Sequence, residues 1–192
     1  MSDINVKLDL ITLAHDIDPK RFSAAFFGED DIGAVIRCHY EVEKAAIYAL
    51  EVLTDGRWKR LRSQYLSEKL NLLEVLGAPP RLLAPARTLN NQRNDFAHEG
   101  LDTLDPQKEL DLTRGVRAFF PQFHDDYSIV LHGKREFTGK FRECSPRQKY
   151  VVSAAILSAL IGSIPVLMKE HRDKVQSIGE IRKRQPVQKP GA

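Results

Sequence analysis

The stretch from Tyr150 to Met168 constrains the fold more than any other part of this chain. It holds 19 consecutive residues without a formal charge, close to the ~20 apolar residues that a membrane-spanning helix needs. It also contains three serines, a glycine and a proline, and basic residues flank both ends. We therefore expect the central helix of a bundle, apolar on all sides because other helices surround it. Ser145 and Pro146 supply an N-cap and a first helical position for it.

Apolar residues at helical spacing predict the other elements. They recur between Ile32 and Leu53 and again between Tyr65 and Leu76. A third helix is expected from about Pro80 to His98, with Gly100 as its C-terminal cap, and a fourth over residues 106–120. The pattern indicates an all-α bundle of about five helices.

Residues 127–141 depart from this helical pattern. They contain β-branched residues around a Gly-Lys turn, which predicts a short β-hairpin inserted in the bundle. With 192 residues and 42% apolar residues, the chain fits one domain with a full core. We expect residues 1–176 to form this single domain and residues 177–192 to form a disordered tail.

Charge is unevenly spread along the chain. Residues 142–192 carry ten Lys and Arg against four Asp and Glu, and the remaining residues carry 19 against 22. The excess is densest at Arg182, Lys183 and Arg184, in a segment without apolar periodicity. Such a tail is interpreted either as a weak nucleic-acid contact or as a solvated segment that aids solubility.

The sequence also bounds the compartment and the chemistry. The first ten residues lack the features of a secretory signal, so we expect a soluble cytoplasmic protein without a membrane span. Cys38 and Cys144 lack ligand spacing and are expected to be reduced structural thiols. His124, Asp125, Asp126 and His132 are interpreted as a solvated acidic turn rather than a metal site. The chain has none of the common nucleotide-binding, serine-hydrolase or zinc-protease motifs, and we expect no cofactor and no metal.

The third predicted helix carries an unusual polar pattern. On a helical wheel Arg93 falls within the apolar stripe formed by Leu82, Ala86, Leu89 and Phe96. Asn90, Asn94 and His98 follow one another at intervals of four, so a polar ridge borders the stripe. Arg93 is therefore expected to point toward the core.

The first predicted helix has a matching anomaly. His39 and Glu43 lie within its own apolar stripe. Because a guanidinium buried alone is unfavourable, Glu43 is the predicted counter-ion of Arg93, with His39 nearby. These residues form either a satisfied structural network or the support of a catalytic site.

At these residues the chain resembles the HEPN superfamily of helical proteins, and the mannitol operon repressor family most closely. The resemblance rests on four blocks and is most specific in the Arg93-Asn94-x-x-x-His98 block. The blocks are Glu29-Asp-Asp-Ile-Gly-Ala-Val-Ile36, Leu70-Asn-Leu-Leu-Glu-Val-Leu-Gly77, Arg93-Asn-Asp-Phe-Ala-His98, and the apolar helix after Arg147-Gln-Lys-Tyr150.

The resemblance implies two alternative functions. Many HEPN proteins are metal-independent ribonucleases that act as homodimers, which would make Arg93 a phosphate stabiliser, His98 a proton-transfer residue and Asn94 an orienting residue, with RNA as the substrate. The mannitol repressor family instead implies a transcriptional regulator that acts through protein contacts without catalysis. A structural protein that binds a partner such as an antitoxin is a third alternative.

Overall fold

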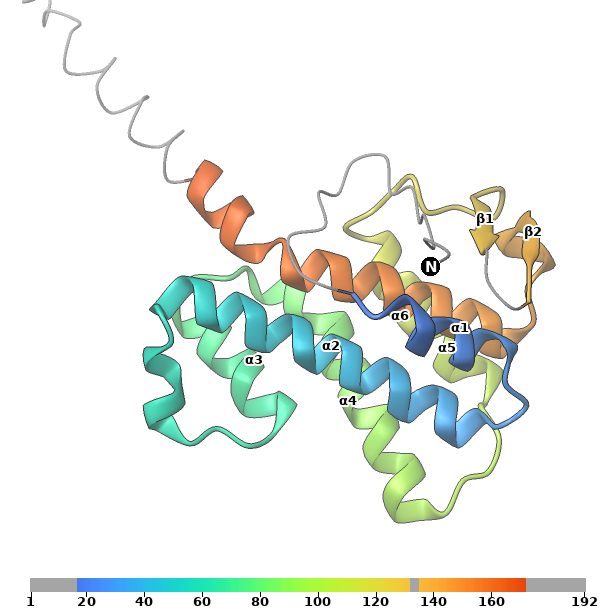
Figure 1. Ribbon diagram of the computed structural model, residues 1–192, viewed down its shortest axis with the longest axis horizontal. Coiled ribbons are helices and arrows are strands. Elements are labelled where there is room, and N and C mark those ends of the chain that lie inside the picture. Colours follow the sequence, from blue (N-terminus) through green and yellow to red (C-terminus); the bar gives the residue numbers. More distant parts are fainter. Residues whose placement is uncertain (1–16, 132–134, 172–192) are drawn as a thin grey trace, which may run out of the picture.

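The computed structural model describes residues 17–131 and 135–171, and most of these residues are helical (Figure 1). All the predicted helices and the hairpin are present, which confirms a helical bundle with a short β-hairpin. They are α2 (Asp31–Thr54), α3 (Leu66–Val75), α4 (Pro80–Glu99), α5 (Pro106–Arg117), α6 (Pro146–Gly162), β1 (Ser128–Leu131) and β2 (Phe137–Lys140). The strands are antiparallel, with Ser128 opposite Lys140. The predicted tail, with Arg182, Lys183 and Arg184, lies outside the described residues.

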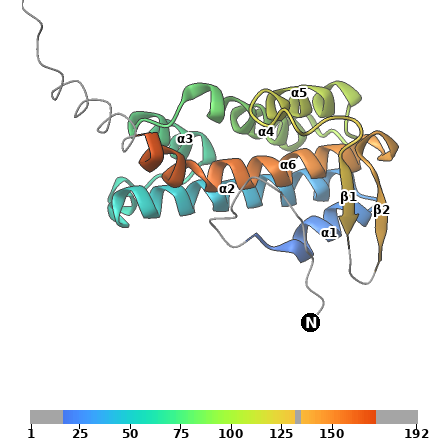
Figure 2. The same cartoon turned by 90° about the horizontal axis from the view of Figure 1, so that it is seen from above.

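Helices α2 and α6 run side by side in the same direction and form the centre of the bundle. Arg147 Nη1 lies 2.9 Å from Asp31 Oδ1 near the start of both helices, and Ser158 Oγ donates to the Glu41 carbonyl further along. Figure 2 shows α1 (Pro19–Phe27) on one side of this pair and α4 and α5 on the other. Parallel neighbours cannot be joined by a short turn, so the intervening helices return the chain to its starting end.

The uncharged stretch is buried by protein over α6, as predicted, but Val166 and Leu167 near its end are exposed. Most residues of α6 are buried, among them Tyr150 and Leu157. The helix was expected to continue to Met168, but it bends by 44° near Ser163 and a shorter helix, Ile164–His171, follows. Pro165 lacks the backbone N–H that would extend the hydrogen-bond ladder. Among the described residues no single helix is long and apolar enough to cross a membrane. The two helices of this bent pair, taken together, have the length and composition of a membrane span.

Three further local features were not predicted. Helix α1 is short and amphipathic, and it is held by tertiary contacts: Phe22 and Phe26 are buried, and Arg21 Nε lies 2.8 Å from the buried Glu41 carboxylate. A 3-10 turn, η1 (Arg57–Leu61), follows α2. Helix α5 ends at Arg117 rather than at residue 120, and a turn follows in which the Phe119 N–H donates to the Val116 carbonyl at 3.0 Å.

Local signals placed the start of α6 and the end of α4 correctly. Ser145 accepts a hydrogen bond from the Gln148 amide as the N-cap of α6. Gly100 ends α4 with φ of 65°, a conformation that glycine adopts without steric strain. Cys38 and Cys144 are free and buried, as expected of structural thiols. Burial raises the pKa of the Cys144 thiol to about 11, so it is protonated at neutral pH.

Candidate functional site

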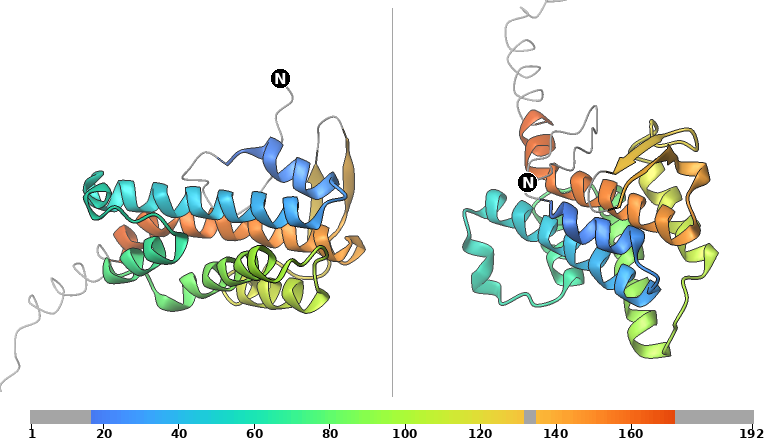
Figure 3. Two further views of the ribbon diagram at one scale, coloured as in Figure 1. Left: turned by 90° about the horizontal axis from the view of Figure 1, so that it is seen from below. Right: turned by 45° about the vertical axis from the view of Figure 1, so that its right-hand side comes forward.

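Helix α4 carries the three residues of the predicted catalytic motif, but it does not bring them together. Arg93 and Asn94 are half-buried, and His98 is exposed in the last turn. Because α4 stays helical through Glu99, His98 lies about 140° around the axis from Arg93. From the sequence, the end of this helix could have unwound and let His98 turn back toward Arg93. The helix does not unwind there. The end of α4 projects beyond the body of the bundle (Figures 1 and 3).

The predicted ion pair between Arg93 and Glu43 does not form. Arg93 Nη1 donates to Asn94 Oδ1 at 3.2 Å, and within the described residues Arg93 has no salt bridge. Glu43 Oε1 instead accepts from Lys69 Nζ on α3 at 2.9 Å. The Lys69 side chain is only 4% exposed, so its ammonium depends on this carboxylate for compensation.

Lys69, the partner of Glu43, was not predicted from the sequence. It lies three residues after Leu66 and four before Leu73, both of which are buried. That spacing places Lys69 on the buried face of α3. A charged residue on an apolar stripe was the signal for Arg93 and Glu43, and the same signal was present at Lys69.

His39 and Asn90 connect α2 to α4 beside Arg93. The Nε2–H of His39 donates to Asn90 Oδ1 at 3.1 Å, and Nδ1 lies 4.0 Å from a Glu43 oxygen. Burial lowers the pKa of His39, while the hydrogen bond to Asn90 and the Glu43 charge oppose this shift; the charges of Arg93 and Lys69 add to it. The charge of Arg93 therefore acts on His39, but within the described residues neither His39 nor Glu43 pairs with Arg93.

The lowered pKa of His39 predicts a pH-dependent stability. Unfolded histidine has its ordinary pKa of about 6.5, so below that pH the unfolded chain binds more protons than the folded chain does. The contribution of His39 is fully present above about pH 6.5 and is lost as the pH falls toward the folded pKa. We expect urea unfolding to show a steeper loss of stability on acidification for wild type than for His39→Gln. Equal pH slopes for the two proteins would contradict this assignment.

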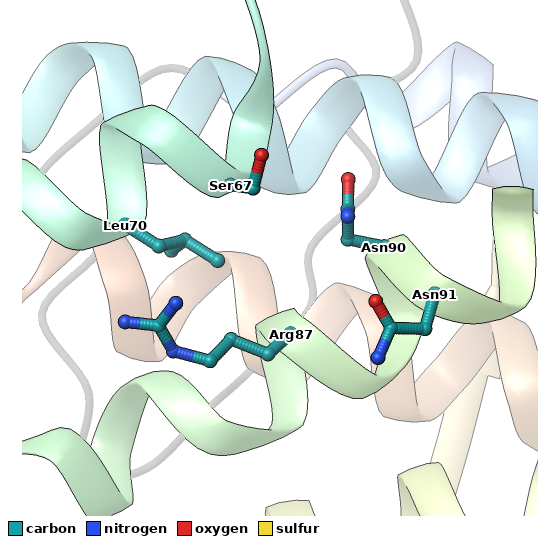
Figure 4. A pocket seen from close by; sticks show the side chains of 5 residues that line it. All are labelled: Ser67, Leu70, Arg87, Asn90 and Asn91. Carbon is teal, nitrogen blue, oxygen red and sulfur yellow. The ribbon is translucent and has the colours of Figure 1, made fainter.

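A small hollow lies between α3 and α4, next to this network. Its volume is about 240 Å³, and Figure 4 shows its lining: Ser67, Leu70, Arg87, Asn90 and Asn91. Arg87 is engaged by Asn71 at 2.7 Å and by Glu74 at 2.6 Å. The hollow is therefore polar without a free charge, and its two asparagines offer both donors and acceptors.

The acidic turn at residues 124–126 pairs with basic side chains. Asp125 Oδ1 accepts from Arg117 at 2.6 Å, and Asp126 Oδ1 accepts from Lys140 at 3.0 Å. These contacts hold the pKa of both carboxyls below the usual value. In the part of the chain that the structure describes, no group of three or more His, Cys, Asp or Glu could hold a metal ion. His132 lies outside the described residues.

Comparison of the chain with models of protein families, with curated proteins and with solved structures returned no match. The resemblance to HEPN proteins thus rests on the residues themselves. Within the described part of the chain, the site combines a guanidinium without a counter-ion and an exposed imidazole five residues later.

Proposed function

We propose that this protein is an HEPN-like cytoplasmic homodimer that binds and cleaves RNA without a metal ion, using Arg93, Asn94 and His98. The observation that carries the proposal is the state of Arg93. Its guanidinium is half-buried and oriented by Asn94, and no described carboxylate neutralises it. Its charge is therefore available to a phosphate, which guanidinium groups bind well.

A homodimer is part of the proposal because one chain offers an incomplete catalytic set. Arg93 and His98 point to different sides of α4, and one imidazole cannot serve as base and acid at once. A two-fold interface brings a residue together with its own copy. The projecting end of α4 leaves His98 exposed for such an arrangement. Ile36, Tyr40 and Ile47 form an exposed apolar stripe on α2 that would be buried favourably in an interface.

In the proposed reaction the two histidines divide the proton transfers. One neutral His98 accepts the proton of the ribose 2′-hydroxyl as its oxygen attacks the phosphorus. The His98 of the second chain, protonated at the start, donates its proton to the departing 5′-oxygen. The products are a cyclic phosphate and a free 5′-hydroxyl, and Arg93 stabilises the charge that develops on the phosphate oxygens.

The test is to incubate the purified protein with total RNA in a chelator while measuring its mass by sedimentation. We expect a dimer that cleaves RNA, and an Arg93→Ala variant whose rate is about 10²–10³-fold lower. Arg93→Lys serves as the matched control, because it retains charge without the planar fork and should lose less. A stable monomer, or a variant as active as wild type, would contradict the proposal.

One observation favours a regulator that acts through protein contacts without catalysis. Arg93 and Asn94 bond to each other, and Asn90 ties α4 to His39 of α2. The first contact lies within α4 and the second joins α4 to α2, so neither of them requires a phosphate. A dimer that leaves RNA intact and retains a protein partner would support this alternative.

A further inference from the structure

A second cationic surface lies far from Arg93 in sequence, at residues 57–62, which we call the basic turn. Four of its six residues are Arg or Lys, and all four are exposed. They are Arg57, Lys59, Arg60 and Arg62. Figure 1 shows this turn in teal, at the end of the bundle opposite β1 and β2. Nothing in the proposed catalytic reaction uses these side chains.

The basic turn is held in a defined shape. Trp58 is buried, and its indole N–H donates to Glu51 Oε2 at 2.9 Å. Arg57 Nε donates to the Thr54 carbonyl at 2.8 Å. Arg62 adopts the left-handed conformation with φ of 52°, which is unfavourable for a residue with a side chain. The backbone of the basic turn is therefore fixed, and its cationic side chains are exposed.

Two of these cations are available for a ligand. Lys59 pairs with Glu51 at 2.9 Å, whereas Arg60 and Arg62 form no salt bridge with any described residue. Arginine binds phosphate in a planar, bidentate geometry. Two uncompensated arginines separated by one residue favour a polyanion over a single small anion.

After the basic turn the chain reaches a surface whose side chains are suited to contact nucleobases. Tyr65 is 66% exposed, which is unusual for so large an aromatic side chain. Ser67, two residues later, lines the hollow between α3 and α4 with Asn90 and Asn91 (Figure 4). From Arg62 to Ser67 the chain spans at most about 18 Å. Cations, an aromatic face and amide groups thus follow one another along one path.

We propose that the basic turn, Tyr65 and this hollow bind single-stranded RNA. Arg60 and Arg62 contact successive phosphates, Tyr65 stacks on a base, and the amides of Asn90 and Asn91 bond to the edge of a neighbouring base. This inference rests on the proposed RNA function and adds its substrate class. The amides of Asn90 and Asn91 offer donors and acceptors that match the edge of a base.

Binding of a fluorescent single-stranded RNA of about 12 nucleotides, followed by anisotropy in a chelator, tests the proposal. We expect Arg60→Gln/Arg62→Gln to weaken binding by about 10-fold and to reduce the salt slope by about 1.4, since each phosphate contact contributes about 0.7. Tyr65→Ala should weaken binding at least about 5-fold. Lys20→Gln/Arg114→Gln removes two exposed charges on α1 and α5 and should change little.

The outcomes separate this surface from the catalytic motif. The RNA-binding surface is supported if His98→Ala binds the oligonucleotide as wild type does and the basic-turn variant does not. This holds even when no cleavage is found. Equal binding by the basic-turn variant and wild type would overturn it. So would tighter binding to duplex RNA, or to phosphatidylserine vesicles that single-stranded RNA fails to displace.

Discussion

Replacing Glu43 with alanine is expected to lower the free energy of unfolding by about 3–5 kcal/mol, because it leaves a buried ammonium without a counter-ion. Lys69 is 4% exposed, and its Nζ would keep only the Gln64 carbonyl, 2.8 Å away. The Glu43 side chain is itself 23% exposed. Lys69→Met is therefore expected to destabilise less, since the carboxylate left behind can reach water.

The double variant Glu43→Ala/Lys69→Met is the control for this prediction. Replacing both members of a buried ion pair with apolar groups is often close to neutral, so the double variant should be more stable than Glu43→Ala alone. Urea unfolding can be followed by the fluorescence of Trp58, the single tryptophan of the chain. A double variant no more stable than Glu43→Ala would show that the pair is not the cause of the loss.

Replacing His98 with alanine is expected to lower the rate of RNA cleavage by about 10²–10⁴-fold, the usual contribution of proton transfer by a positioned side chain. Stability should be unchanged within about 0.5 kcal/mol, because His98 is exposed at the end of α4. The measurement is the initial cleavage rate of a defined RNA in a chelator, together with urea unfolding of the same protein.

Mixed dimers sharpen this test. A dimer with one wild-type and one His98→Ala chain has a single imidazole and cannot supply both base and acid, so it should be nearly as slow as the homodimeric variant. Glu99→Ala, at the neighbouring exposed position, is the matched control and should retain the wild-type rate. Full activity in the mixed dimer would contradict the paired arrangement, and full activity in the His98→Ala homodimer would exclude a catalytic role for His98.

The basic turn shows that the net charge of a long segment can conceal a local cluster of cations. Residues 1–141 carry 19 basic against 22 acidic side chains, so their net charge directed attention to the C-terminal tail. The run Arg57-Trp58-Lys59-Arg60-Leu61-Arg62 was nevertheless present in the same residues. A window of six residues would have detected the charge. Only the structure shows that Trp58 is buried and that the cations are exposed.

The sequence by itself determined helices α2 to α6, the caps at Ser145 and Gly100 and the burial of α6, because these depend on the order of residues along one helix. Apolar spacing and the signals at Ser145 and Gly100 act over one or two turns. The partner of Glu43 was decided by tertiary structure. A helical wheel shows that Arg93, Glu43 and Lys69 each lie on an apolar face, but not which two of these faces meet. That choice depends on how α2, α3 and α4 rotate and slide against one another, and their packing places Glu43 beside Lys69 and leaves Arg93 without a counter-ion in the described residues.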